Sequence, residues 1–412
     1  MAKRKRVLSG MRPTGRLHLG HYFGALQNWL KLQEEYDCFF FVADWHALTT
    51  HYEDTSSVAE NTLQVAMDWL AVGLDPAKSV LFVQSRVLEH AELYVLLSMI
   101  TPLSWLERVP TYKEQVENLT DRDLGTYGFL GYPLLQSADI VIYDADIVPV
   151  GEDQVPHVEL TREIVKKFNA QYGFRVDYDH FKTENLPGLV AAIYPADSKT
   201  GAGSGDPFRA QAKEINSAVL RKQILEEGAQ NFKKRIGREN WKYFRIATVL
   251  REPGFLLTET PRLPGTDGRR MAKSYGNAIW LSEGPDEIRV KVRNMMTDPQ
   301  RQRRTDPGRP EVCPVFAWHK LFSPPATVAW SDQGCRTAGI GCIECKAAMA
   351  DHLVKWIEPI QARRKELEAR PEEVWSILNA GSKKAQKAAR RTMRRVRSAL
   401  FHWEEVRKAG GN

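Results

Sequence analysis

The chain has 412 residues, of which 43% are hydrophobic and 26% are charged, and its formal net charge is +7. This composition is typical of a globular protein of two or three domains. No apolar run approaches the ~20 residues that a membrane-spanning helix needs, and the basic residues 2–6 lead into a short strand without the apolar stretch of a signal peptide. We therefore expect a cytoplasmic protein that does not bind membranes.

Strands and helices alternate in the first half of the chain. Apolar strands are expected at residues 7–9, 38–43 and 80–83, with helices at 20–34 and 58–69. The uninterrupted apolar run at 38–43 is typical of a strand buried on both faces of a parallel sheet. The pattern predicts an α/β fold of Rossmann type, with a doubly wound parallel sheet, and such folds bind nucleotides at the first strand-turn-helix. Further strands are expected at 147–150 and 255–257.

Residues 184–252 interrupt this alternation. They include a glycine-rich linker at 198–205, followed by Asp206 and Pro207, which are typical of a helix start. The sequence predicts an inserted, mostly helical subdomain there. The catalytic domain then comprises residues 1–183 and 253–297, and residues 298–412 form a C-terminal helical domain.

A basic run lies near the C-terminus. It contains eight cations and no acid: Lys383, Lys384, Lys387, Arg390, Arg391, Arg394, Arg395 and Arg397. Such a run favours a polyanionic partner such as RNA, and it is equally typical of a solvated helix face.

Two short segments carry the chemistry of nucleotide binding. The first, His18-Leu19-Gly20-His21, lies where the first strand turns into a helix, so free backbone N–H groups favour an anion there. Gly20 lets the backbone approach a flat ligand, and both histidines can donate hydrogen bonds to phosphate. The second, residues 270–274, lies between glycines and brings a cation, Lys273, on a loop that can close over a ligand.

Together these segments resemble the paired ATP-binding motifs, HIGH and KMSKS, of class I aminoacyl-tRNA synthetases. Lys273 and Ser274 match the second motif. Arg270 replaces its first lysine and keeps the charge, whereas Ala272 replaces a serine and removes a hydroxyl group. These two departures leave the control of loop closure open.

Three further segments, residues 43–49, 132–139 and 148–154, and the order of all five resemble tryptophanyl-tRNA synthetases. The resemblance covers most of the chain except residues 184–252, whose role it does not explain. It implies a homodimer that activates L-tryptophan with ATP and Mg²⁺ and transfers it to tRNA(Trp), with the C-terminal domain recognising the anticodon.

The resemblance also assigns roles to residues. It places ATP at Ser9, Gly10, Met11, Arg12, His18, Gly20, His21, Gly151, Glu152, Asp153, Arg270, Met271, Ala272, Lys273 and Ser274, of which His18, His21, Lys273 and Ser274 act in catalysis. It places tryptophan at His46, Tyr132, Gln136, Asp139 and Gln154. Asp139 would accept a hydrogen bond from the indole N–H, which is a donor only.

Four of the five cysteines gather in one segment: Cys313, Cys335, Cys342 and Cys345. Thiolates suit zinc or an iron–sulfur cluster, and the spacing, with a single close pair, leaves both possible. The segment resembles that of a bacterial subset of the family, which implies a [4Fe–4S] cluster in place of Zn²⁺. Cys38, in an apolar strand, is expected to be a buried small hydrophobe.

Two alternatives remain at this point. A tyrosine-specific class I synthetase would share the fold and both ATP motifs. A non-catalytic protein that binds RNA or senses redox state on the same fold is the other, although it would have no need of His18, His21, Lys273 and Asp139 together.

Overall fold

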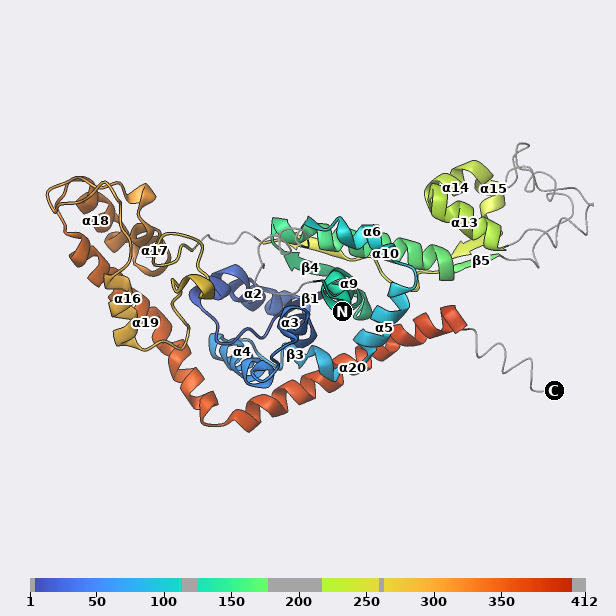
Figure 1. The fold of residues 1–412 in the computed structure, drawn as a ribbon, viewed down its shortest axis with the longest axis horizontal. Helices are drawn as coiled ribbons and strands as arrows, with labels where there is room; N and C mark the ends of the chain where they lie inside the picture. The colour runs from blue at the N-terminus through green and yellow to red at the C-terminus, as the bar shows by residue number, and fades with distance from the viewer. Residues whose placement is uncertain (1–3, 111, 113–124, 177–216, 259–262, 402–412) are drawn as a thin grey trace, which may run out of the picture. The chain divides into compact units, whose positions relative to one another are not determined.

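The computed structural model describes residues 4–110, 112, 125–176, 217–258 and 263–401 (Figure 1). The chain forms two compact units, each assembled from three segments. The first unit comprises Met1–Val87, Pro149–Glu152 and Leu256–Ala385, and the second comprises Leu88–Val148, Asp153–Phe255 and Gln386–Asn412. The domain boundaries expected from the sequence stay a prediction. The expected linker at 198–205 and helix start at Asp206 lie outside the described residues.

Five strands form one parallel sheet in the order β3-β2-β1-β4-β7. Their bounds are β1 (Arg6–Met11), β2 (Asp37–Val42), β3 (Ser79–Val83), β4 (Ile147–Val150) and β7 (Gly254–Leu257). The chain adds β2 and β3 on one side of β1 and then crosses to add β4 on the other side. The predicted doubly wound α/β fold is confirmed. The point where the strand order reverses, between β1 and β4, is where such sheets bind ligands.

The apolar run predicted as a doubly buried strand is β2. Its register pairs Val7 with Cys38 on one side and Cys38 with Ser79 on the other. From Cys38 to Val42 every residue is buried, and Trp29 stacks on Phe40 with ring centroids 4.4 Å apart. The expected role of Cys38 as a buried small hydrophobe is confirmed, since its side chain is fully buried.

The first unit is rich in helices, which continue into the C-terminal region. They are α1 (Leu19–His21), η1 (Tyr22–Leu26), α2 (Gln27–Glu35), α3 (Asp44–His51), α4 (Val58–Val72), η2 (Gln84–Arg86), η5 (Lys273–Tyr275), α16 (Pro285–Arg293), η6 (Pro310–Val312), α17 (Pro314–Phe322), α18 (Pro325–Arg336) and α19 (Cys342–Glu368). The predicted helices at 20–34 and 58–69 are confirmed. The long helix α19 packs against α4, α16 and α17 (Figure 1).

The second unit is mostly helical. It contains α5 (Glu89–Ser98), α6 (Leu103–Glu107), α8 (Tyr127–Leu130), α9 (Tyr132–Ile142), α10 (Val155–Tyr172), α13 (Ser217–Glu227), α14 (Ala229–Ile236) and α15 (Arg238–Trp241). The short turn η3 (Glu152–Gln154) begins at the last residue of a first-unit segment and ends in the second unit. The inserted segment also has a strand: β6 (Phe244–Ile246) pairs antiparallel with β5 (Phe174–Val176). Phe174, Phe232 and Phe244 give this part a core of its own.

The last helix, α20 (Pro371–Phe401), runs from the first unit into the second. It holds the basic run, and three of the eight cations form ion pairs within the second unit: Arg390 with Glu89, Arg395 with Asp144, and Arg397 with Glu92. None of the helices that the structure describes is sufficiently long and apolar to cross a membrane.

Candidate active site

The two ATP-binding segments lie together in the first unit, although about 250 residues separate them in the chain. The backbone N–H of Gly20 donates to Met271 Sδ at 3.3 Å, and Lys273 Nζ donates to the carbonyl oxygen of Thr14. His18 also forms an antiparallel bridge with Trp280. The structure therefore brings a glycine, two histidines and a lysine to the carboxyl end of β1.

Tight packing fixes the turn that follows β1. A side chain at Gly20 would place its Cβ 2.9 Å from the His18 ring, and one at Gly10 would place it 2.5 Å from the Phe41 ring. Both glycines therefore permit contacts that no other residue allows. A π-helical turn, η1, begins directly after His21, and such turns are frequent at functional sites.

His18 and His21 form a close, tilted pair of neutral rings. Their ring centroids lie 3.8 Å apart, and the His18 backbone N–H donates to His21 Nδ1 at 3.2 Å. Burial lowers the pKa of His18 to about 4, helped by Lys273 and Arg270, and burial lowers that of His21 to about 3. His18 Nδ1 is buried without a hydrogen-bond partner among the described residues. An orphaned ring nitrogen of this kind suits a ligand atom.

These low pKa values predict a pH dependence of stability. Below pH 6.5 the unfolded chain protonates His18 and His21, whereas the folded chain keeps them neutral until about pH 4. The unfolded state then binds more protons, so stability must fall as the pH falls through this window. We expect the melting temperature to drop between pH 7 and pH 5, and His21→Gln to reduce that drop. An identical drop in the variant would show that His21 does not titrate in this way.

The KMSKS-like loop is organised by a residue that sequence reasoning missed. Asn277 is buried, and its amide donates to Asp267 Oδ1 at 2.7 Å and to the carbonyl of Arg270 at 3.0 Å. Its side-chain oxygen accepts the N–H of Ala272 at 2.9 Å. Ala272 lacks the hydroxyl group of the serine in the motif, but Asn277 holds the backbone of the loop at this position. Arg270 and Ser274 are exposed, and Lys273 Nζ lies 5.2 Å from the Trp280 ring centroid.

Asp68 is a second residue that was not predicted. It is fully buried on α4, and its Oδ2 accepts the N–H of Leu17, directly before His18, at 2.7 Å. Arg364 of α19, itself buried, donates to Asp68 Oδ1. Burial raises the pKa of Asp68 to about 6, against the opposing effect of Arg364. This ion pair fastens the turn before His18 to a helix of the C-terminal region, and a charged residue within the apolar face of α4 is the signal that could have revealed it.

Other predicted residues of the first unit lie at strand ends. Ser9, Gly10 and Met11 belong to β1, and Arg12 follows it. His46 is buried on α3, directly after β2, and Gly151 and Glu152 follow β4. These positions surround the point where the strand order reverses.

The remaining candidates for tryptophan and ribose belong to the second unit. Tyr132, Gln136 and Asp139 share one face of α9 because they are spaced four and three residues apart. The Tyr132 hydroxyl lies 3.4 Å from His157 Nε2, and Gln154 Nε2 donates to Asp153 Oδ2 at 2.9 Å. Asp139 is 1% exposed.

Asp139 belongs to a buried chain of three polar side chains. Its Oδ1 lies 2.5 Å from His90 Nδ1, and His90 Nε2 lies 2.6 Å from the Tyr143 hydroxyl. His90 and Tyr143 are both fully buried. Neither residue was predicted from the sequence, because nothing in the order of residues places α5 against α9.

The four cysteines of the C-terminal region come from three helix ends. Cys313 precedes α17, Cys335 lies near the end of α18, and Cys342 and Cys345 share the first turn of α19. Each thiol interacts electrostatically with the other three. Burial raises the pKa of Cys313 and Cys335, and that of Cys345 to about 11. Among the described residues, however, no group of three or more His, Cys, Asp or Glu is arranged to hold a metal ion.

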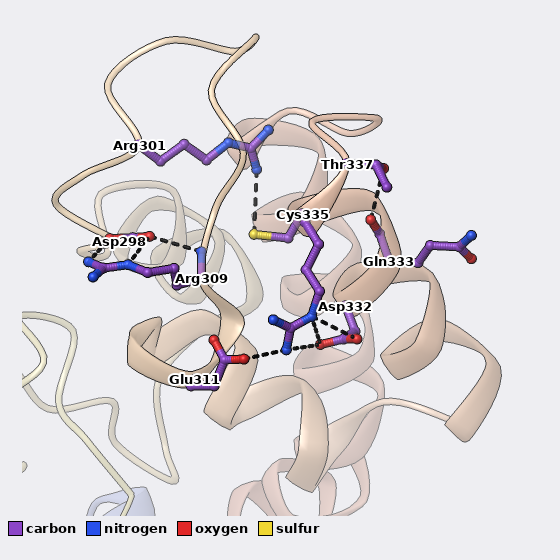
Figure 2. Close-up of polar contacts among 9 residues, drawn as sticks. Asp298, Arg301, Arg309, Glu311, Asp332, Gln333, Cys335 and Thr337 are labelled. Atoms are coloured by element: carbon purple, nitrogen blue, oxygen red, sulfur yellow. Dashed lines mark hydrogen bonds and ion pairs between the residues drawn. The ribbon is translucent and has the colours of Figure 1, made fainter.

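Ion pairs surround this cysteine region, as Figure 2 shows. Arg301 points at Cys335, with Nη1 3.6 Å from its Sγ, and also donates to the carbonyl of Ile340 at 2.6 Å. Arg309 pairs with Asp298 at 2.8 Å, and its hydrogen bonds lower the pKa of that carboxyl well below the usual range.

Two cations near the cysteines in the chain have partners within the protein. Arg336 pairs with Asp332 and Glu311, and Lys346 Nζ donates to the carbonyl of Arg293 at 3.0 Å.

Comparisons with known proteins agree with this geometry. The family model of class I tRNA synthetases (W and Y) matches residues 1–189 and 225–358. The chain is 48% identical to a tryptophan–tRNA ligase of Ralstonia nicotianae, over 96% of this chain and 98% of that protein. It is 43% identical to the corresponding ligase of Thermotoga maritima, with the same coverage. Among solved structures, a tryptophanyl-tRNA synthetase of Campylobacter jejuni, complexed with ADP and tryptophan, matches with a TM-score of 0.71 at 27% identity, over 96% of this chain and 99% of that one.

Proposed function

Because this chain belongs to the class I tRNA synthetases of the W and Y family and catalyses the ligation of tryptophan to tRNA, we propose how its residues divide that work. In the first step a carboxylate oxygen of tryptophan attacks the α-phosphorus of ATP in line, and the bond to the β-phosphate oxygen breaks. Pyrophosphate leaves with Mg²⁺ and tryptophanyl-adenylate remains. In the second step a hydroxyl group of the terminal ribose of tRNA attacks the acyl carbon, and AMP leaves.

The main support for this proposal is the contact between the two ATP-binding segments. No protein nucleophile is needed, because the reaction gains from positioning and from stabilising charge. His18 and His21, neutral at pH 7, offer N–H donors to the phosphates, and Lys273 and Arg270 offer positive charge to the departing pyrophosphate. Gly20, next to Met271, would let the backbone approach the base, and Gly151, Glu152 and Asp153 would contact the ribose.

Selectivity for tryptophan is assigned to α9 and its neighbours. Asp139 would accept the indole N–H, and Tyr132 and Gln154 would hold the ammonium group, while Gln136 and His46 complete the site. A buried acceptor discriminates more strongly than a pocket that reads shape alone, because a substrate without the N–H leaves it unpaired. Tyrosine, the alternative substrate, has no ring N–H, and the similar relatives named above are ligases of tryptophan.

A homodimer in the cytoplasm is proposed as well. In the second unit, an exposed apolar row follows one face of α5 and continues beyond it: Leu88 is 67% exposed, Val95 48%, Met99 72% and Leu103 59%. A second copy of the chain is the partner that the family implies, and burying such a row would stabilise the pair. The substrates of protein synthesis support the cytoplasm as its location.

The candidate surface for tRNA consists of exposed cations on α20. Arg390, Arg395 and Arg397 are engaged with acids, whereas Lys387, Arg391 and Arg394 project from the exposed side of α20. We assign phosphate contacts to the latter three. Anticodon recognition is assigned to the C-terminal domain, residues 298–412.

We further propose that Cys313, Cys335, Cys342 and Cys345 hold a [4Fe–4S] cluster, with Zn²⁺ as the alternative. What supports this is the donor set: four thiols that interact with one another, at helix ends that ligand binding can adjust, beside the cation Arg301. The cluster would supply structural cross-linking of α17, α18 and α19. The four side chains are not arranged as a closed ligand set in this structure, so the assignment rests on the chemistry of the residues.

Iron analysis tests this assignment. Protein purified without oxygen should be brown and contain about four irons per chain, as this cluster type requires. Cys342→Ser should lose the iron and reduce tRNA charging more than pyrophosphate exchange, because adenylate formation uses residues at the strand ends. Cys38→Ser serves as the matched control that keeps the iron. Colourless protein with one tightly bound zinc would contradict the cluster, and equal losses of both activities would contradict its separation from the ATP site.

A further inference from the structure

The buried side chains behind Asp139 point to a residue that sets the specificity of the amino-acid site. We propose that His90 is a positioning residue: its Nδ1–H orients the carboxylate of Asp139 as the acceptor for the indole N–H. This inference rests on the proposed role of Asp139 and names the residue on which that role depends.

His90 and Asp139 form a short, buried contact. His90 Nδ1 lies 2.5 Å from Asp139 Oδ1, and the two side chains are 0% and 1% exposed. An ionised carboxylate only accepts hydrogen bonds, so we assign the proton of this contact to Nδ1. A contact of this length between a ring N–H and a carboxylate belongs to the strong, charge-assisted class.

The other ring nitrogen of His90, Nε2, contacts Tyr143. His90 Nε2 lies 2.6 Å from the Tyr143 hydroxyl, and the rings of His90 and Tyr143 meet edge-on with centroids 5.2 Å apart. If the phenol donates to Nε2, that nitrogen is the acceptor and the ring proton lies on Nδ1. Tyr143 therefore selects the tautomer that serves Asp139.

The contact with His90 fixes the orientation of the Asp139 carboxylate. A carboxylate buried to this degree, without a hydrogen-bond donor, takes up a proton or rotates, and either change spoils it as an acceptor. With Oδ1 engaged by His90 from α5, the carboxylate is fixed on α9, which packs directly against α5. A carboxylate has about four acceptor positions, so the contact with His90 is compatible with a hydrogen bond from the indole N–H as well.

The arrangement separates two functions that sequence reasoning assigned to one residue. Asp139 reads the substrate, and His90 keeps Asp139 able to read it. A purely structural role for His90 would affect stability and leave the choice of substrate unchanged, so the two roles can be distinguished by measuring substrate preference.

The test compares three substitutions at one position. The amide nitrogen of asparagine takes the place of Nδ1 and that of glutamine takes the place of Nε2, whereas alanine removes both. The readout is pyrophosphate exchange with L-tryptophan and with its sulfur isostere, benzothienylalanine, whose ring has no N–H. We expect His90→Ala and His90→Gln to lower the preference for tryptophan over the isostere by about 10- to 100-fold, as for a lost hydrogen bond to a charged group. His90→Asn should restore most of it.

Thr161→Val is the matched control, because it removes a buried hydrogen bond, at 2.9 Å, from α10 to Ser137 on α9, the helix that also carries Asp139. It should lower the melting temperature and leave the preference unchanged. An unchanged preference in His90→Gln, or a His90→Asn variant as impaired as His90→Gln, would overturn the role of His90. If Asp139→Asn itself keeps the wild-type preference, the indole acceptor lies elsewhere and the proposed role of Asp139 fails first.

Discussion

Replacing Lys273 by alanine should slow the formation of tryptophanyl-adenylate by about 10²- to 10³-fold, which is the usual effect of removing one donor that stabilises a charged transition state. Lys273 Nζ bonds Thr14 in the turn before His18 and lies over the Trp280 ring, so the cation already stands at the ATP segment. Tryptophan binding should change little, because its candidate residues lie on other elements. Pyrophosphate exchange measures the first effect, and equilibrium binding of tryptophan measures the second.

Arg269→Ala is the matched control for that variant. Arg269 belongs to the same loop and is exposed, and its guanidinium pairs with Asp267 at 2.6 Å instead of facing the histidines. It should keep pyrophosphate exchange within a few-fold of wild type. Exchange at the wild-type rate in Lys273→Ala would remove this lysine from the chemistry.

Asp139→Asn should reduce kcat/KM for tryptophan by about 10²-fold and shrink the preference for tryptophan over phenylalanine and tyrosine. An amide can present its NH₂ group to the indole N–H, and two opposed donors leave both unpaired in a buried site. The loss should therefore be larger for tryptophan than for substrates without the N–H. Kinetics of exchange with the three amino acids measure the change.

A neighbouring aspartate provides the control. Asp144 lies just beyond the end of α9, pairs with Arg395 and has a positive φ of 51°, a conformation that asparagine adopts readily. Asp144→Asn should leave the preference among amino acids intact. If Asp139→Asn also leaves it intact, the acceptor of the indole N–H must be another residue.

Structural features that depend on residues close together in the chain could be predicted well from the sequence. The apolar run of β2 and the turn at Gly20 are local features, and both appear where expected. The contact between the two ATP-binding segments, through Gly20 and Met271, could be expected only because the segments resemble a known pair of motifs. No local pattern would have placed these segments side by side.

Partners that belong to different elements could not be predicted. Asp68 and Arg364 are 296 residues apart, and their pairing depends on α19 packing against α4. His90 reaches Asp139 only because α5 lies against α9. In the basic run, similar arginines have different roles for the same reason: Arg397 meets Glu92, whereas Arg394 remains exposed. Charge can be counted in a sequence, but its partners are set by tertiary packing.

Pyrophosphate exchange with each of the twenty amino acids in turn shows which amino acid this chain activates. We expect rapid ATP-dependent exchange with tryptophan and slow exchange with every other amino acid, tyrosine and phenylalanine included. Exchange driven best by tyrosine, or no exchange with any amino acid, would contradict it.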